Sequence, residues 1–137
     1  MSFKQIGVIG AGQMGRGITQ VMATAGYELV MVDLNENALH MALSVIESSL
    51  TKLNDKGIID ERPSTVLSRI RCETEMAAVA DCDLVIEAAT ENETIKNKIF
   101  KQLDELCKPD AVLASNTSSL SITKLAATTS RPDKVIG

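Results

Sequence analysis

Short aliphatic runs alternate along this chain with longer stretches in which apolar residues recur every three or four positions. A short apolar run that ends at a turn residue is typical of a buried strand, and the longer spacing is typical of a helix. The runs predict strands over residues 6–9, 29–32, 70–72, 84–88, 112–115 and 135–136. The spaced stretches predict helices over residues 14–25, 35–53, 63–67, 76–79, 95–106 and 122–127.

Repeated alternation of strand and helix favours parallel pairing through right-handed crossovers. We therefore expect an α/β fold with a Rossmann-type, doubly wound, mainly parallel sheet and helices on both faces. The length of 137 residues fits one domain, and residues 1–137 are expected to form it. Aromatic residues make up 2% of the chain, so the core must be aliphatic, which suits parallel strands covered by helices.

The composition argues against several classes of partner. The formal net charge is −4 and there is no Lys/Arg cluster, so a nucleic-acid partner is not expected. The first apolar run is too short to span a membrane and lacks the layout of a signal peptide. Cys72, Cys82 and Cys107 are far apart and lack metal-ligand spacing, so we expect buried, reduced thiols in a cytoplasmic protein without a metal site.

A G-x-G-x-x-G motif stands directly after the first predicted strand and opens the first predicted helix. Its residues are Gly10, Ala11, Gly12, Gln13, Met14 and Gly15. In this context the first glycine permits a tight turn, the second lets the backbone approach a pyrophosphate, and the third lets helix and strand pack closely. The amino end of the helix then offers N–H donors and the positive end of its dipole. The motif predicts dinucleotide binding, and the alternative is a merely flexible turn.

Asp33 ends the second predicted strand, eighteen residues after Gly15. A carboxylate there can accept hydrogen bonds from both ribose hydroxyls of an adenosine, and it would repel a 2′-phosphate. The adjacent residues, Leu34 and Asn35, include no arginine that could hold such a phosphate. We therefore expect NAD rather than NADP as cofactor. The alternative role for Asp33 is to cap the next helix, and the two roles are compatible.

Two further segments decide the family. Residues 85–92 (VIEAATEN) and 114–119 (ASNTSS), together with the glycine loop and Asp33, resemble the 3-hydroxyacyl-CoA dehydrogenases, especially the 3-hydroxybutyryl-CoA type. The resemblance covers essentially the whole chain. It implies an NAD-binding domain of an enzyme that oxidises (S)-3-hydroxyacyl-CoA, an acyl-CoA substrate, to 3-oxoacyl-CoA.

The resemblance also implies roles for individual residues near the nicotinamide. Ser118 matches the active-site serine that hydrogen-bonds the substrate's 3-oxygen beside the cofactor, and Asn116 supports the same loop. Ala88, Glu91 and Lys96 match positions that line or contact the nicotinamide half of NAD. From local pattern alone, Ser118 would cap the helix that follows it. Glu91 would stabilise the amino terminus of the next helix, and Lys96 would be solvated.

Ser49 and Lys56 match residues that hold the CoA part of the substrate in this family. They are seven residues apart, about two helical turns, so they share one face of the predicted helix, with Lys52 near it. An ammonium group on this face can meet the phosphates of CoA. The alternative is the polar outer stripe of an amphipathic helix.

Oxidation of a hydroxyl group also needs a general base, usually a histidine. The resemblance places that histidine after the last predicted strand, and His40, the single histidine of this sequence, lies early in a helix instead. We therefore expect the general base and the helical substrate and dimerisation domain of the family to be absent from residues 1–137. The full-length form is expected to be a homodimer, and the exposed 135–136 strand could support self-association. The alternatives are a free-standing NAD-binding module, a 3-hydroxyisobutyrate-type dehydrogenase, and a structural protein such as the related lens crystallins.

Overall fold

The computed structural model describes residues 3–115 and 122–137. Its strands are β1 (Gln5–Ile9), β2 (Glu28–Val32), β3 (Ile70–Glu73), β4 (Leu84–Glu87), β5 (Val112–Ser115) and β6 (Val135–Ile136). Its α-helices are α1 (Gln13–Thr24), α2 (Glu36–Asp55), α3 (Pro63–Leu67), α4 (Glu93–Leu106) and α5 (Ile122–Ala126). Two short 3-10 helices, η1 (Met76–Val79) and η2 (Pro132–Lys134), complete the described elements. Each predicted element is present, with ends that differ from the prediction by at most two residues.

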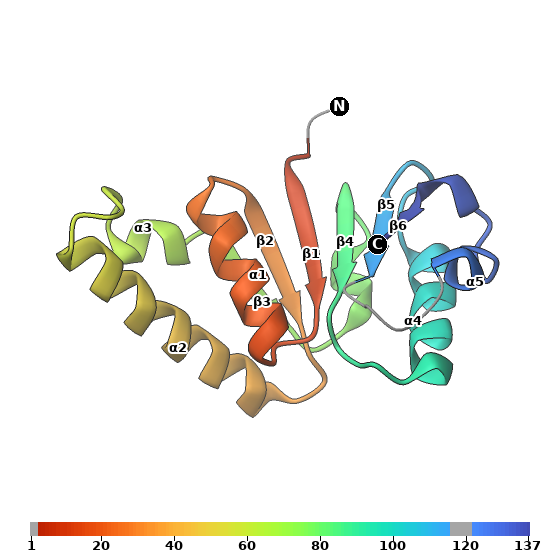
Figure 1. Cartoon of the computed structure of the whole chain (residues 1–137), viewed down its shortest axis with the longest axis horizontal. Coiled ribbons are helices and arrows are strands. Elements are labelled where there is room, and N and C mark those ends of the chain that lie inside the picture. The colour runs from red at the N-terminus through yellow and green to blue at the C-terminus, as the bar shows by residue number, and fades with distance from the viewer. Residues whose placement is uncertain (1–2, 116–121) are drawn as a thin grey trace.

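The six strands form one sheet in the order β3-β2-β1-β4-β5-β6, and every neighbouring pair is parallel. This order confirms the predicted doubly wound sheet. The chain runs outward from β1 to β3, then returns to the centre and continues from β4 to β6 (Figure 1). The strand order reverses between β1 and β4, and open α/β sheets bind ligands at such a point, beyond the carboxyl ends of the strands.

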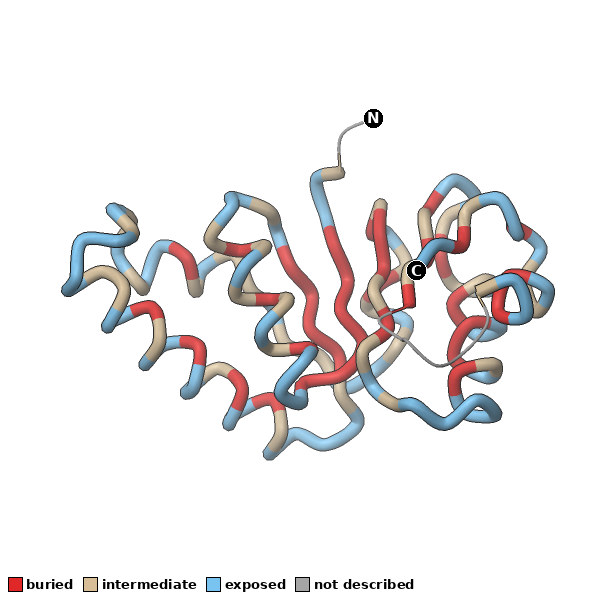
Figure 2. Tube along the Cα trace, viewed as in Figure 1, coloured by how far each residue is buried: buried red, intermediate tan, exposed pale blue. Residues whose placement is uncertain are grey.

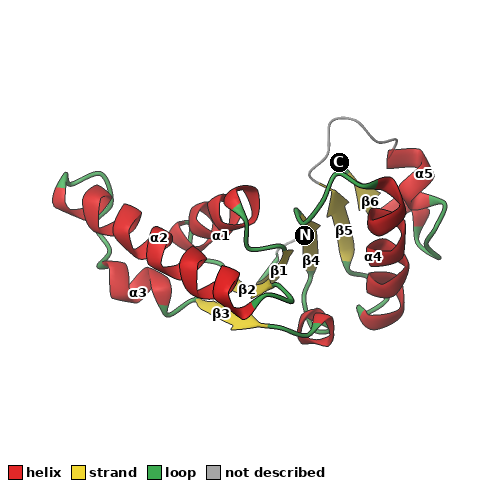
Figure 3. Cartoon of the chain, turned by 90° about the horizontal axis from the view of Figure 1, so that it is seen from below, coloured by secondary structure: helices red, strands yellow, loops and turns green. Residues whose placement is uncertain are grey.

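Helices cover both faces of the sheet, as predicted. One apolar cluster joins the α2 residues Ile46 and Leu50 to the strands, and a second joins Phe100 and Leu103 of α4. Helices α1 to α3 lie at the β3 end of the molecule, and α4 and α5 lie beside β5 and β6 (Figures 1 and 3). The central strands are buried along most of their length (Figure 2). Side chains that point alternately to either face of a strand produce these two layers.

Local signals explain where several helices begin. Asn35 caps α2, because its side chain accepts a hydrogen bond from the backbone N–H of Ala38 at 3.2 Å. Asn92 caps α4 in the same way through the N–H of Ile95 at 3.0 Å. Asparagine is a preferred N-cap because its short side chain reaches an N–H that has no partner within the helix. The helix predicted over residues 35–53 thus begins at an asparagine cap.

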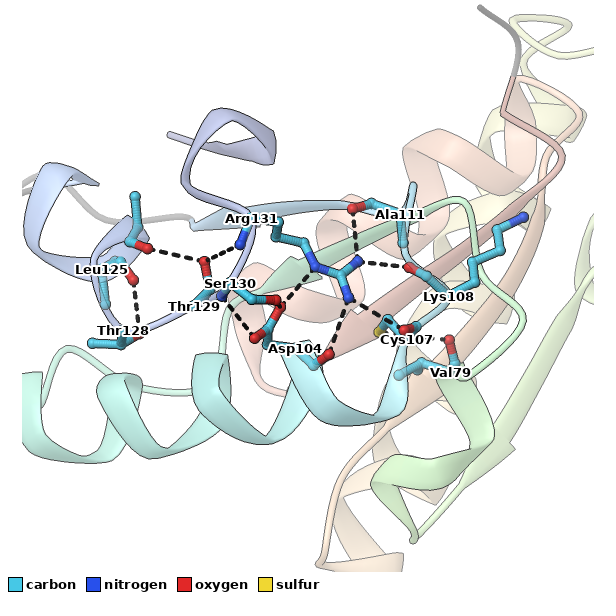
Figure 4. A network of polar contacts seen from close by, with 11 residues as sticks. Val79, Asp104, Cys107, Lys108, Ala111, Leu125, Thr128, Thr129, Ser130 and Arg131 are labelled. Atoms are coloured by element: carbon cyan, nitrogen blue, oxygen red, sulfur yellow. Dashed lines mark hydrogen bonds and ion pairs between the residues drawn. The ribbon is translucent and has the colours of Figure 1, made fainter.

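Arg131 holds the turn before β6 against the end of α4 (Figure 4). Its Nε donates to Asp104 Oδ1 at 2.8 Å, and its terminal nitrogens donate to the carbonyl oxygens of Asp104, Cys107, Lys108 and Ala111. The last carbonyls of a helix lack partners within it, and a planar guanidinium can bind several of them at once. We call this group the Arg131 clasp. It fixes the edge strand β6 to the rest of the domain.

The cysteines partly follow the expectation from composition. All three are free thiols; Cys82 and Cys107 are buried, whereas Cys72 is half-buried. Burial raises the pKa of Cys82 to about 11, so this thiol stays protonated at neutral pH. Within the described parts of the chain, no helix combines the length and the apolarity that crossing a membrane requires.

Candidate functional site

The register of the central strands assembles the candidate site. Val32, Ile9, Glu87 and Ser115 are consecutive partners across β2, β1, β4 and β5, at the carboxyl end of each strand. The residues that follow them therefore begin the loops at one edge of the sheet. These residues include Asp33, Gly10 and Ala88, which sequence analysis had already selected. The structure brings them together at the point where the strand order reverses.

Gly10 and Gly15 are required by the packing of the loop between β1 and α1. Gly10 has a φ of +110°, and a Cβ atom on it would lie 2.8 Å from the carbonyl oxygen of Ala88. A Cβ on Gly15 would lie 1.8 Å from the carbonyl oxygen of Gly10. Neither position can accept a side chain unless backbone moves. The predicted tight turn at Gly10 and close helix–strand packing at Gly15 are confirmed.

Gly12 has a different environment from the other two glycines of the motif. A Cβ placed on Gly12 would meet no atom within 4 Å, and its φ of −74° is open to any residue. The fold therefore gives no steric reason for glycine here. Gly12 is also the N-cap of α1, where, among the described residues, no side chain caps the first-turn N–H groups. The helix start is thus bare, with N–H donors and a positive dipole end available to an anion.

Asp33 connects β2 to the glycine loop. Its Oδ2 accepts from the backbone N–H of Ala11 at 2.9 Å, and its Oδ1 accepts from the N–H of Asn35 at 2.9 Å. The carboxylate therefore supports both the loop and the turn into α2, but the N-cap of that helix is Asn35 and not Asp33, so the helix-capping role considered from the sequence is wrong. Asp33 is half-buried, so part of it stays accessible beside the start of α1. A carboxylate has about four acceptor positions, so these two bonds leave capacity for ribose hydroxyls.

A hollow of about 190 Å³ lies between the start of α1 and the loop that joins β4 to α4. Its lining residues are Met14, Ala88, Ala89, Thr90 and Glu91. Three residues selected from the sequence therefore meet in one small space next to the bare helix end. This supports the expectation that Ala88 and Glu91 line one half of a cofactor site, which stays a prediction.

A fully buried ion pair lies beneath this loop. The side chains of Glu87 and Lys96 are both 0% exposed, and the ammonium group donates to Oε1 of the carboxylate. The ammonium group also lies 3.4 Å from the hydroxyl oxygen of Ser115 at the end of β5. The other carboxylate oxygen of Glu87 accepts from the backbone N–H groups of Ala89 at 2.8 Å and Thr90 at 3.2 Å. The alternative of a solvated Lys96 is wrong, because the first turn of α4 packs this side chain onto the strand ends.

Neither Glu87 nor Ser115 has a role predicted from the sequence. A signal for Glu87 was present, because an acidic residue closes an otherwise apolar strand and needs a partner when buried. The partner could not be identified from spacing alone. The bonds of Glu87 also explain why β4 ends one residue before the predicted end, since the chain turns to bring Ala89 and Thr90 onto the carboxylate.

The predicted CoA-binding residues lie on and just after α2. Ser49 is half-buried, and its hydroxyl oxygen accepts from Gln20 Nε2 of α1 at 2.9 Å. Lys52 is exposed in the last turn of α2, and the exposed Lys56 is its C-cap. His40 is also on α2; its side chain is 74% exposed and lies 3.9 Å from Glu36. His40 is thus a surface residue, as expected.

Four residues of the resemblance fall in the segment 116–121. Asn116, Thr117, Ser118 and Ser119 lie outside the described residues. The catalytic role predicted for Ser118 and the supporting role of Asn116 therefore stay predictions. The strand that leads to them, β5, ends at Ser115 as expected.

A known protein family and several known proteins match nearly the whole chain. A family model described as the NAD-binding domain of 3-hydroxyacyl-CoA dehydrogenase matches residues 5–137. A curated relative from Deinococcus radiodurans, named probable 3-hydroxybutyryl-CoA dehydrogenase, is 51% identical over 97% of this chain and 48% of its own length. The 3-hydroxybutyryl-CoA dehydrogenase of Bradyrhizobium diazoefficiens is 47% identical over 98% of this chain and 46% of its own. The chain thus spans about half the length of the curated relatives it matches.

Solved structures agree with the sequence relatives. The (S)-3-hydroxybutyryl-CoA dehydrogenase of Ralstonia eutropha superimposes with a TM-score of 0.93 and 43% identity, over 98% of this chain and 48% of that one. The 3-hydroxybutyryl-CoA dehydrogenase of Escherichia coli gives a TM-score of 0.95 and 38% identity, over 98% of this chain and 29% of that one. The fold is therefore that of a part of each of these enzymes.

Proposed function

Because the chain belongs to the NAD-binding domain family of the 3-hydroxyacyl-CoA dehydrogenases, we propose that the protein oxidises (S)-3-hydroxyacyl-CoA to 3-oxoacyl-CoA. The cofactor of this family's domain is NAD. The observation that carries the proposal is the bare amino end of α1, joined through Ala11 to the carboxylate of Asp33. An anion site next to a ribose acceptor suits a dinucleotide without a 2′-phosphate.

The described residues fit NAD on structural grounds. The open space at Gly12 lets a diphosphate approach the N–H groups at the start of α1. Asp33 accepts from the hydroxyls of the adenosine ribose. Ala88 and Glu91 line the hollow that receives the nicotinamide half. Bound NAD supplies the hydride acceptor, and the protein's part is to hold that acceptor next to the substrate carbon.

The groups that act on the substrate are proposed on the resemblance. Ser118 donates a hydrogen bond to the 3-oxygen of the substrate, and Asn116 supports the loop that carries it. A general base must accept the hydroxyl proton as the hydride leaves. His40 does not fit this role, because it is exposed on α2 beside Glu36. Because His40 is the single histidine of these 137 residues, the general base is either another type of residue in them or a group outside them.

The CoA part of the substrate is proposed to lie over the carboxyl-terminal half of α2. Ser49 and Lys52 belong to that half of the helix, and Lys56 is its C-cap. Because Gln20 donates to the oxygen of Ser49, the hydroxyl proton of Ser49 can be donated to another acceptor, such as a phosphate. A homodimer and a cytoplasmic location belong to the same proposal; three free cysteines support the location.

Calorimetric titration of the 137-residue chain tests the cofactor part of the proposal. NAD should bind, and NADP should bind at least about tenfold more weakly, since Asp33 repels a 2′-phosphate. Equal affinity for both would contradict the role of Asp33. Turnover of (S)-3-hydroxybutyryl-CoA with NAD is measured in the shortest polypeptide that contains residues 1–137 and is active. There, Ser118→Ala should lower kcat about a hundredfold while NAD still binds; an unchanged kcat would exclude the proposed role of Ser118.

A further inference from the structure

The Glu87–Lys96 pair lies where the cofactor site is proposed, and burial of two charges needs a reason. Both side chains are 0% exposed. A buried ion pair rarely stabilises a fold more than a well-packed apolar pair would, because both charges lose their hydration. The pair is also at the edge where the strand order reverses, since Glu87 is the last residue of β4 and is opposite Ile9 of β1. Its position therefore suggests a role in ligand binding rather than in stability.

The carboxylate of Glu87 sets the polarity of the loop above it. Its Oε2 binds the N–H groups of Ala89 and Thr90, so these two donors point at Glu87 and cannot bind a ligand. Both residues line the 190 Å³ hollow. The start of α1, on the other side of the hollow, keeps its N–H donors free of side-chain caps. The wall formed by the start of α1 thus attracts anions through its backbone. On the opposite wall, the N–H groups of Ala89 and Thr90 are already bound to Glu87.

The other oxygen of Glu87 fixes the position of a cation. Lys96 is on the first turn of α4, and its ammonium group lies between Glu87 of β4 and the hydroxyl of Ser115 at the end of β5. A flexible four-carbon side chain is held in one place by acceptors from two neighbouring strands. The contacts of Lys96 therefore join β4, α4 and β5 beneath the loop that lines the hollow.

We infer that Glu87 is a positioning residue for the nicotinamide half of the cofactor. It orients the loop at Ala89 and Thr90 and holds Lys96, and it does not contact the reacting atoms. The inference rests on the proposed function, because it assumes that the cofactor's nicotinamide half occupies the hollow. It distinguishes the two halves of the cofactor, since the diphosphate and the adenosine are bound by α1 and Asp33.

The test compares Glu87→Gln with the wild-type 137-residue chain, using NADH and ADP as separate probes. ADP has the adenosine and the diphosphate but lacks the nicotinamide riboside. Glutamine has the size of glutamate, but its single oxygen cannot satisfy both the loop N–H groups and Lys96. The dissociation constant for NADH should rise at least about tenfold, whereas that for ADP should change less than about twofold. NADH fluorescence reports the first value and calorimetry the second.

Asp104→Asn is the matched control. Asp104 also belongs to a largely buried ion pair on α4, but it lies in the Arg131 clasp at the opposite end of that helix. This variant should lower the stability while leaving the ratio of NADH to ADP affinity unchanged. If Glu87→Gln is too unstable to measure, Glu87→Gln/Lys96→Met removes both charges together and should fold. The double variant should show the same selective loss of NADH binding.

The outcomes separate the inference from the function on which it rests. A wild-type chain that binds neither NADH nor ADP would overturn the cofactor role of the site and the inference with it. A wild-type chain that binds both, with Glu87 variants that lose both equally or lose neither, would overturn the inference alone. Selective loss of NADH in the Glu87 variants but not in Asp104→Asn would support it.

Discussion

Alanine substitution at three glycines of α1 and its N-cap should separate the folding role of this segment from its ligand-binding role. At Gly15 a Cβ atom would lie 1.8 Å from the carbonyl oxygen of Gly10, whereas real Cβ contacts essentially never fall below 3.0 Å. Helix α1 must therefore move from the loop by roughly 1 Å or more, and crowding of this size costs about 3 kcal/mol of unfolding free energy. Gly15→Ala should lower stability by that amount and weaken NAD binding as a consequence.

The same substitution at Gly12 should have the opposite profile. Its Cβ would enter open space and its φ of −74° suits alanine, so stability should change by less than about 1 kcal/mol. The methyl group would nevertheless occupy the space through which a diphosphate reaches the helix end. Binding of NAD to Gly12→Ala should therefore fall at least about tenfold in a well-folded protein.

Gly17→Ala is the control, because Gly17 is exposed within α1 and a Cβ there meets nothing within 4 Å. Alanine should stabilise this helix by about 0.5–1 kcal/mol and leave NAD binding unchanged. Urea unfolding measures the three stabilities, and calorimetry measures the three affinities. If Gly12→Ala binds NAD as the wild type does, the backbone at Gly12 is not the diphosphate site. If Gly15→Ala is as stable as the wild type, the argument from packing fails.

Three further predictions concern single side chains. Asp33→Asn should weaken NAD binding about tenfold and reduce the ratio of NAD affinity to NADP affinity. An equal loss of affinity for NAD and NADP would mean that Asp33 only shapes the loop. Burial alone would raise the pKa of Asp104, but hydrogen bonds from Ser130 and Arg131 outweigh it and hold the pKa below the ordinary value. Its contribution to stability is therefore fully present above about pH 4 and is lost as pH falls through the lowered pKa. In urea unfolding across this range, the free energy of unfolding should fall less on acidification in Asp104→Asn than in the wild type. Ile136 is 49% exposed on the edge strand β6, so any self-association seen by light scattering should decrease in Ile136→Lys; an unchanged oligomer would place the contact elsewhere.

The sheet and its helices could be predicted because their signals are local. The run 84–88 predicts a strand whatever surrounds it, and Asn35 caps α2 through an N–H only three residues away. General rules on parallel crossovers limit the strand order to a few possibilities once the alternation is known, and the structure supplies the order itself. The glycine loop and Asp33 were predictable for the same reason, because their spacing is part of one β-α-β unit.

The polar centre of the site could not be predicted in this way. Lys96 follows four exposed residues, 92–95, in the sequence, and a lysine at the start of a helix is ordinarily solvated, so its local pattern indicates a solvated side chain. Its burial depends on how α4 packs on the ends of β4 and β5, which is a property of the tertiary structure. Likewise, the contacts of Lys96 with Glu87 and with Ser115 join residues from three elements. A resemblance can mark such residues, but the contacts that explain them come from the fold.

The two loops at the reversal point also give a physical reason for the place at which the diphosphate of the cofactor should bind. A diphosphate needs several N–H donors, and the start of α1 offers them without a competing side-chain cap. The loop after β4 cannot offer those of Ala89 and Thr90, because Glu87 accepts from both. With the diphosphate at α1 and Asp33 on the β2 side, the remaining half of the molecule must extend toward β4, where the hollow lies. Both halves of NAD carry a ribose with two hydroxyls, so the backbone donors select the place of the diphosphate, and the assignment of the adenosine half to Asp33 is part of the proposed function.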